Sequence, residues 1–207
     1  MGRTIWGRAT SSNVMKVVWL LEELGQPYER LDAGGAFGKT DTAEYRAMNP
    51  TGLVPTLQED GFTLWESNAI LRYLCAACGG TSLFPVEPRA RANVDRWMDC
   101  QQTQLNRPQS VVFIGMVRTP PEQRDRAGLV QAVAEAGRAW ALLEAPLSRH
   151  PFIAGDALSV ADIAWGVHVH RWFAMDIDRP PAPDLRRWYD RLLERPAYAA
   201  HVARPLA

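Results

Sequence analysis

The sequence predicts an α/β domain followed by an all-helical domain, and two observations support this. The first 80 residues alternate short strand-like segments with helical stretches, whereas from residue 89 onward apolar residues recur only at helical spacing. Between the two regions, residues 81–88 (TSLFPVEP) have the composition of a linker. We therefore expect one domain over residues 1–80 and a second, all-α domain over residues 89–207.

The N-terminal region is predicted to begin with a strand, a helix and a second strand. The helix shows apolar residues at helical spacing and is ended by Gly25 and Pro27. Because a helix connects the two strands, we expect them to be parallel with a right-handed crossover. In chain order the predicted segments are a strand at 3–7, a helix at 14–24, a strand at 28–31, a glycine-rich loop at 32–42 and a short helix at 43–48.

The segment 49–67 (NPTGLVPTLQEDGFTLWES) is the most informative part of the chain. Asp60-Gly61 separates two strand-like tetrapeptides, TLQE and FTLW, and predicts a tight hairpin turn, because such a turn needs backbone angles that glycine adopts readily. A helix is predicted to follow over residues 69–74, with the Ser67 hydroxyl as its N-terminal cap.

The C-terminal region shows no strand signal, and prolines separate its predicted helices. The first is expected to run over residues 89–117, with a kink at Pro108. A later helix is predicted to open with a capping box, with Ser159 at the cap and Asp162 three residues on, and both are assigned to folding rather than to catalysis. The remaining helices are predicted at 129–143 and 185–192.

Composition argues against several functions. Basic and acidic residues balance at 23 each, so the sequence shows no electrostatic signature of binding to nucleic acid or to an anionic membrane. No apolar run approaches the length of a membrane span, and the first residues lack a signal-peptide core. Three cysteines, an odd number, favour a reducing, cytoplasmic compartment. Cys75 and Cys78 lie at the end of a predicted helix, where the dipole disfavours a thiolate, so a redox role is not favoured.

The pattern NPxGxVPxLxxxxxxLxESxAIxRYL, read over residues 49–74, resembles the glutathione-binding segment of the soluble glutathione transferases. The resemblance extends over nearly the whole chain. It implies a thioredoxin-like N-terminal domain that binds glutathione, an all-helical C-terminal domain that carries the acceptor-substrate site, and a homodimer. It also implies glutathione as the co-substrate and a cis peptide bond between Val54 and Pro55.

The same resemblance implies how glutathione is held. The γ-glutamyl carboxylate would bind Ser67 and nearby backbone N–H groups at a helix N-terminus, and Glu66 would pair with the γ-glutamyl ammonium. Val54, exposed by the cis bond to Pro55, would offer its N–H and C=O to the cysteinyl unit, as an added strand does at a sheet edge. Lys39 would bind the glycyl carboxylate.

Glutathione chemistry depends on its thiol, whose pKa of about 8.5 leaves only a few per cent ionised at neutral pH. A hydrogen-bond donor at the N-terminus of the first helix would stabilise the thiolate, and that position falls on Ser11, Ser12 and Asn13. The pattern SSNVMK resembles the phi-type enzymes, which places the thiol-activating residue at Ser11. It also resembles the nu-type bacterial enzymes, which places that residue at Asn13. Ser12 is a third candidate, or a plain helix cap.

The acceptor substrate is expected in the cleft between the domains, near the first long helix. Candidate residues there are Arg107, Ser110, Val111, Phe113, Ile114 and Met116. His168 and His170 are two positions apart on a helix and point to different faces, so no metal site is predicted. The predicted function is a serine-type glutathione transferase that acts on a small hydrophobic electrophile. Two alternatives stay open: a glutathione-dependent disulfide oxidoreductase, and a non-enzymatic ligand- or protein-binding member of the same fold.

Overall fold

The computed structural model describes residues 2–207 and has a four-stranded mixed sheet in its N-terminal part. β1 and β2 are parallel, as their connecting helix requires, and the other two neighbouring pairs are antiparallel. The predicted parallel pair is therefore confirmed. In spatial order the strands are β2 (Glu29–Leu31), β1 (Arg3–Trp6), β3 (Thr56–Glu59) and β4 (Phe62–Trp65).

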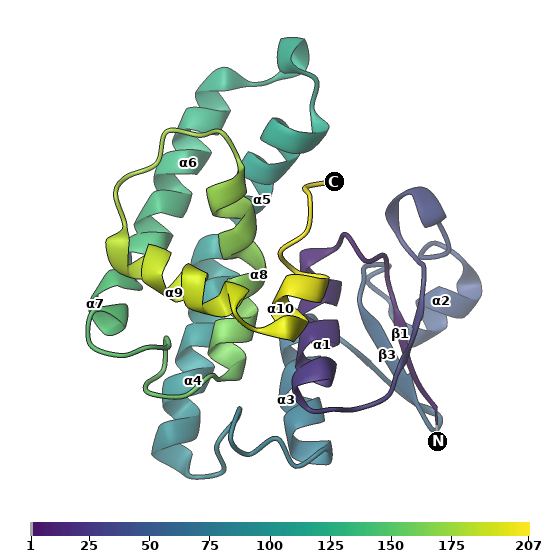
Figure 1. The fold of residues 1–207 in the computed structure, drawn as a ribbon. Coiled ribbons are helices and arrows are strands. Elements are labelled where there is room, and N and C mark those ends of the chain that lie inside the picture. Colours follow the sequence, from purple (N-terminus) through teal and green to yellow (C-terminus); the bar gives the residue numbers. More distant parts are fainter. Residues whose placement is uncertain (1) are drawn as a thin grey trace.

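Three helices cover the sheet: α1 (Ser12–Glu23), α2 (Ala43–Met48) and α3 (Ser67–Ala77). Figure 1 shows α1 and α3 on one side of the strands and α2 on the other. The hairpin between β3 and β4 turns at Asp60 and Gly61, whose φ angles are 49° and 81°. A type I′ turn needs two consecutive positive φ angles, so the predicted Asp-Gly hairpin is confirmed.

The C-terminal part is built from helices that pack beside α1 and α3 (Figure 1). Two of them, α7 and α10, were not predicted, because segments of four and six residues are too short to show a helical period. The helices are α4 (Pro88–Cys100), α5 (Asn106–Phe113), α6 (Arg126–Ala141), α7 (Glu144–Leu147), α8 (Val160–Ala174), α9 (Pro183–Leu193) and α10 (Pro196–His201).

The single helix expected over residues 89–117 is interrupted, which corrects the prediction. A wider, π-type turn occurs at Gln101–Leu105 and again at Ile114–Arg118. Pro108 has no N–H to donate to the carbonyl of Gln104, and its ring would clash with that carbonyl. The backbone therefore departs from regular helical geometry one turn before Pro108, rather than at the proline itself.

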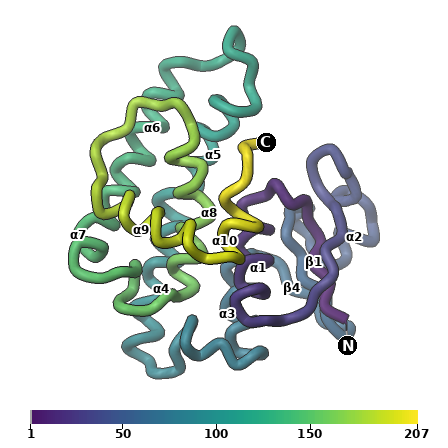
Figure 2. The backbone as a smooth tube through the Cα atoms, in the orientation of Figure 1, coloured from purple at the N-terminus to yellow at the C-terminus, as the bar shows by residue number. Residues whose placement is uncertain are grey.

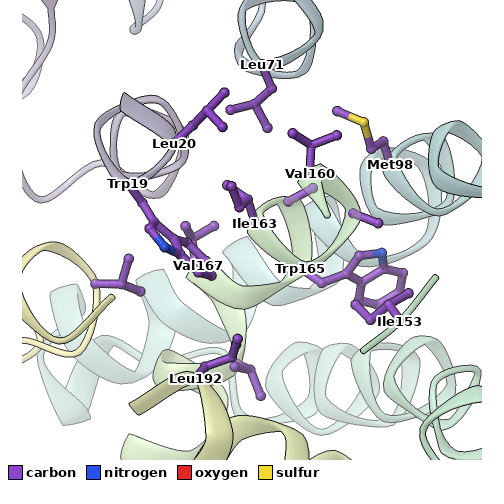
Figure 3. Close-up of a cluster of buried hydrophobic side chains, with 14 of the residues drawn as sticks. Trp19, Leu20, Leu71, Met98, Ile153, Val160, Ile163, Trp165, Val167 and Leu192 are labelled. Atoms are coloured by element: carbon purple, nitrogen blue, oxygen red, sulfur yellow. The ribbon is translucent and has the colours of Figure 1, made fainter. Parts of the chain in front are cut away.

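A continuous hydrophobic core joins the two parts of the chain. Figure 3 shows Trp19 and Leu20 of α1 gathered with Leu71 of α3 and with Ile163 and Val167 of α8. These side chains have no exposed surface, and burial of each stabilises the fold by roughly 2–3 kcal/mol. Because α1 is held along its length by this core, the position of its N-terminal end is fixed by contacts from both parts.

The start of α8 is held by the buried carboxylate of Asp162. It accepts hydrogen bonds from the backbone N–H of Ile153 and of Ser159, both at 2.9 Å, and from the Ser159 hydroxyl at 3.0 Å. The indole N–H of Trp188 donates a fourth, also at 3.0 Å. The predicted capping box is confirmed, and these contacts account for both residues through folding alone.

Candidate active site

A cavity of about 440 Å³ lies where the N-terminal end of α1 meets the end of α5. One wall is formed by the residues that begin α1, and a second by two loops that contain Gly34 and Val54. The third wall belongs to the helical part of the chain and includes Phe113. The cavity therefore lies between the two parts, where the sequence predicted the reaction to occur.

The three thiol candidates all line this cavity. Ser11 precedes α1 with extended backbone angles (φ −82°, ψ 122°), and its side chain makes no capping hydrogen bond. Ser12 is the first residue of the helix, so the interpretation of Ser12 as a plain cap is wrong. The first N–H groups of α1 lack intrahelical partners and give this end a partial positive charge. The Ser11 hydroxyl is thus free to donate to an anion in the cavity.

Asn13 connects this end of α1 to the start of α3. Its Oδ1 accepts a hydrogen bond of 3.3 Å from the hydroxyl of Ser67. Ser67 is the first residue of α3 rather than its cap, which corrects the prediction; Glu66 holds the cap position and makes no side-chain capping bond. Asn13 lines the cavity, and its amide Nδ2 has no hydrogen-bond partner among the described residues.

Glu66 has an unusual backbone conformation. Its φ of 70° and ψ of 109° lie outside the regions that residues with a side chain adopt readily. Such a conformation costs on the order of 1–3 kcal/mol and is found most often where a ligand is bound. Its side chain is exposed, so the carboxylate is accessible to a cationic group.

The Val54–Pro55 peptide bond is cis, as predicted. Among the described residues, neither the N–H nor the C=O of Val54 has a hydrogen-bond partner. The preceding loop is fixed, because the Leu53 carbonyl accepts hydrogen bonds from Tyr45 Oη at 2.6 Å and from Asn49 Nδ2 at 2.9 Å. Val54 therefore offers a rigid, unpaired peptide edge to the cavity.

Seven of the predicted residues do not line this cavity: Lys39, Pro55, Glu66, Ser67, Arg107, Val111 and Met116. Lys39 is exposed on its loop, and its neighbour Thr40 lines the cavity instead. Arg107 is exposed on α5, whereas Met116 lines a separate, larger cavity of about 910 Å³ against α6. Of the predicted acceptor residues, the structure brings Ser110, Phe113 and Ile114 to the site.

Three arginines line this cavity, Arg8, Arg118 and Arg171, and the sequence analysis assigned none of them a role at the site. The guanidinium of Arg171 lies 3.9 Å from the centre of the Phe113 ring and donates to the carbonyl of Thr10 at 2.7 Å. Burial, and then the charges of Arg118 and Arg8, lower the pKa of Arg171 to about 10. No pattern in the sequence indicates this cluster, because its members come from distant segments.

A buried lysine, Lys16, forms hydrogen bonds close to the site. Lys16 has no exposed surface, and its Nζ donates to the side-chain oxygens of Asn68 at 3.2 Å and of Gln101 at 2.9 Å. Both acceptors are uncharged amides. Burial lowers the pKa of Lys16 to about 7, and the attraction of Glu66 opposes that shift. Because Lys16 follows Asn13 by one turn and Asn68 adjoins Ser67, this contact fixes the same two helix ends.

Two further features concern residues 2–207 only. They contain no group of three or more histidine, cysteine, aspartate or glutamate residues placed to hold a metal ion. None of their helices is both long and apolar enough to cross a membrane.

Two protein-family models match the chain. Residues 10–77 match the family model described as "Glutathione S-transferase, N-terminal domain", and residues 112–191 match "Glutathione S-transferase, C-terminal domain". The Escherichia coli K12 protein named glutathione S-transferase GstB is 42% identical over 206 residues, which cover 99% of each chain.

Solved structures agree with this match. A theta-class glutathione S-transferase from Xanthomonas axonopodis pv. citri, crystallised with glutathione bound, has a TM-score of 0.96 and 44% identity over 100% of this chain and 99% of its own. A glutathione S-transferase from Pseudomonas fluorescens has a TM-score of 0.85 and 32% identity over 95% and 97% of the two chains.

The chain belongs to the glutathione S-transferase family. Membership makes it a transferase enzyme with glutathione as its co-substrate, and so confirms the predicted family and the predicted glutathione transferase function. It also confirms the predicted fold class, a thioredoxin-like α/β domain followed by an all-α domain.

Proposed function

We propose that the enzyme is of the serine type, with Ser11 as the residue that stabilises the glutathione thiolate. The observation that carries this proposal is the state of the Ser11 side chain. It lies at the cavity end of α1 and makes no capping bond, whereas Asn13 already accepts a hydrogen bond from Ser67. Lowering the thiol pKa by about two units requires roughly 2.7 kcal/mol of stabilisation of the thiolate. One hydrogen-bond donor and the helix N-terminus can together supply this free energy.

Glutathione would lie along the edge between α3 and the Val54 loop. The Ser67 hydroxyl and the first N–H groups of α3 would bind the γ-glutamyl carboxylate, and Glu66 would pair with the ammonium. The free peptide groups of Val54 would bind the cysteinyl unit, which directs its sulfur toward Ser11. We keep Lys39 as the residue for the glycyl carboxylate, reached by movement of its exposed side chain.

The reaction then needs no covalent bond to the protein. The thiol proton passes to water, the thiolate attacks an electrophilic carbon to form a thioether, and the leaving group departs with its electron pair. The Ser11 hydroxyl stabilises the anion before attack. Phe113, Ile114 and Ser110 would contact the acceptor.

Calorimetry and thiolate absorbance on wild type, Ser11→Ala, Asn13→Ala and Ser12→Ala test this assignment. We expect wild type to lower the thiol pKa and Ser11→Ala alone to restore it to about 8.5, with glutathione affinity nearly kept. An unchanged thiol pKa in Ser11→Ala would reject Ser11.

Disulfide reduction is the second candidate, favoured by the placement of Asn13. Asn13 lines the cavity and its Oδ1 accepts from Ser67, so its Nδ2 could direct the thiolate toward a glutathionyl disulfide. Loss of the thiol pKa shift only in Asn13→Ala, together with turnover of a small mixed disulfide, would select this reaction. A wild-type protein that binds no glutathione would instead support a purely ligand-binding role.

We propose a homodimer. β4 is an edge strand of the sheet, and Phe62 and Trp65 on it are 45% and 37% exposed. Apolar side chains of this size on a sheet edge are typical of an interface. Analytical ultracentrifugation should give twice the chain mass for wild type and a shift toward monomer for Phe62→Asp. A wild-type monomer at micromolar concentration would reject the dimer.

We propose the domain boundaries 1–80 and 89–207, with residues 81–88 as the linker. α3 ends at Ala77 and α4 begins at Pro88, which supports this division. Limited proteolysis should cut first within 81–88, and early cleavage elsewhere would move the boundary.

We also propose a cytoplasmic location, since Cys75, Cys78 and Cys100 are free thiols. Cell fractionation tests this proposal, and recovery in a membrane or secreted fraction would reject it.

A further inference from the structure

The charge of the active-site cavity is strongly one-sided. Arg8, Arg118 and Arg171 all line it, and none of its lining residues in the described chain is an aspartate or a glutamate. Three guanidinium groups around a space of about 440 Å³ create a positive potential that no acidic side chain in the wall cancels. Burial, and then repulsion from neighbouring arginines, lowers the pKa of Arg8 and of Arg171. The arginines therefore destabilise one another's charged forms.

Each arginine is held where it is by a specific contact. Arg171 donates to the Thr10 carbonyl and stacks on the Phe113 ring. Arg118 lies 5.1 Å from the centre of the same ring and donates to the backbone oxygen of Ala207 at 3.3 Å. Figure 2 shows the last segment of the chain returning toward the start of α1, which brings that backbone oxygen near the cavity.

Arg8 is accommodated by a glycine loop. A Cβ atom at Gly34 would lie 3.2 Å from Arg8 Nη1, and one at Gly35 would lie 3.3 Å from Arg8 Cδ. Larger residues at these two positions would crowd the Arg8 side chain. The three cations are therefore placed by one glycine loop, one aromatic ring and two backbone oxygens. Among residues 2–207, no aspartate or glutamate side chain forms an ion pair with any of them.

We propose that the acceptor half of this cavity binds an anionic electrophile, in which a carboxylate, sulfonate or phosphate group contacts the arginines while an apolar body packs on Phe113 and Ile114. This inference rests on the proposed transferase function and refines its substrate class from hydrophobic to amphipathic. Guanidinium groups bind such oxyanions through paired hydrogen bonds. No aspartate or glutamate among the described residues that line the cavity competes for their donors.

Two of the three arginines, Arg118 and Arg171, lie on the acceptor side, whereas Arg8 comes from the loop between β1 and α1 in the sheet part. Arg118 and Arg171 belong to the helical part and share Phe113, whereas the proposed glutathione ligands Val54 and Ser67 come from the sheet part. Both carboxylates of glutathione have other proposed ligands. The arginines are therefore left for the second substrate.

The test compares 4-chloro-3,5-dinitrobenzoate with its methyl ester, which share a ring and differ in charge. In both, the glutathione thiolate attacks the chlorine-bearing carbon, a C–S bond forms, and chloride leaves with the C–Cl electron pair. The thiol proton passes to water. For each protein we take the ratio of kcat/KM for the anion to kcat/KM for the ester. A general change in activity affects both values and cancels in this ratio, so a change in the ratio between proteins reports recognition of the charge.

We expect wild type to favour the anion. Arg118→Gln should reduce the ratio about fivefold to tenfold, mainly through KM, and Arg118→Glu should reduce it further. Arg118 is exposed, so neither change threatens the fold. Arg126→Gln is the matched control, because it removes the same charge from an exposed helix position outside the cavity and should leave the ratio unchanged.

Three outcomes would overturn the proposal. A ratio that stays the same in Arg118→Gln and Arg118→Glu would show that the arginines do not contact the acceptor. An equal loss of glutathione affinity, measured by calorimetry, would assign them to glutathione instead. Turnover of the ester without any preference for the anion would reject the anionic class while leaving the transferase intact. Failure of wild type to convert either compound would count against the proposed function itself.

Discussion

The Ser67 hydroxyl donates to the Asn13 side chain over 3.3 Å and so joins the first residue of α3 to the second residue of α1. The proposed γ-glutamyl site and the proposed thiol site are therefore linked by one hydrogen bond. Occupation of Ser67 by a carboxylate would turn its hydroxyl toward the ligand and release Asn13 Oδ1, so that the Asn13 side chain becomes free to rotate.

Ser67→Ala tests this link. We expect the Kd for glutathione to rise about tenfold, because a hydrogen bond to a charged group contributes roughly 1.5–3 kcal/mol. The free energy of unfolding should change by less than about 1 kcal/mol, since the lost bond is a single one between side chains. Calorimetry and urea denaturation measure the two quantities. Ser82→Ala, at an exposed position, is the control, and an unchanged affinity in Ser67→Ala would reject the γ-glutamyl site.

Glu66→Gly should change stability and binding in opposite directions. Glycine adopts a φ of 70° without strain, so we expect the free energy of unfolding to rise by about 1 kcal/mol. Loss of the carboxylate should weaken glutathione binding about tenfold or more. Glu66→Gln is the matched control, because it removes the charge and keeps the strain: binding should weaken with no gain in stability. A destabilised Glu66→Gly protein would contradict this account.

Lys16 should make stability depend on pH. Its folded-state pKa of about 7 lies below its ordinary value of 10.5, so the unfolded chain binds more protons in between. The free energy of unfolding should therefore rise with pH, by roughly 1 kcal/mol per unit from about pH 7 to about pH 10.

Urea denaturation at several pH values, on wild type and Lys16→Met, isolates this contribution as the difference between their slopes. The variant leaves the oxygens of Asn68 and Gln101 without their donor, so its absolute stability can fall at every pH. Parallel pH profiles for the two proteins would show that Lys16 does not titrate in this range.

Two glycines in the helical part should respond oppositely to alanine. At Gly166 an added Cβ would lie 2.7 Å from the Trp19 ring, so Gly166→Ala should lower the free energy of unfolding by about 2–3 kcal/mol. At Gly137 the nearest atom would be 3.5 Å away, in Pro180, and Gly137→Ala should stabilise α6 by roughly 0.5–1 kcal/mol. Thermal and urea denaturation measure both, and equal effects would contradict the packing described for α8.

Local patterns were enough to predict the sheet and its hairpin. The hairpin turn at Asp60-Gly61 and the capping box of Ser159 and Asp162 each depend only on residues close together in the sequence. Both were therefore predicted correctly. The three thiol candidates could be located from the sequence because they precede a helix whose apolar residues recur at helical spacing. They line the cavity, and their role in thiol activation stays a prediction.

The features that were missed depend on contacts between distant residues. Arg8, Arg118 and Arg171 are brought together only when the helical part packs on α1, and an arginine carries no pattern that reveals its neighbours. The kink was predicted at Pro108, but the helix is interrupted at Gln101–Leu105. The sequence shows the proline, but it does not show on which side of the proline the backbone departs from helical geometry. Lys16 is buried by α3 and α8 rather than by its own helix.

The packing of α1 has a consequence for how this enzyme could be recombined with its relatives. Trp19 fits against Gly166 with no space for a methyl group, and the opposite end of the same helix carries Ser11. A chimaera that exchanged the helical half at the proposed linker would set a foreign α8 against Trp19 and shift the helix end that carries Ser11, the proposed thiol-activating residue. Exchange of α1 together with the helical half would keep that fit, so we expect such a chimaera to be more stable than one that exchanges the helical half alone.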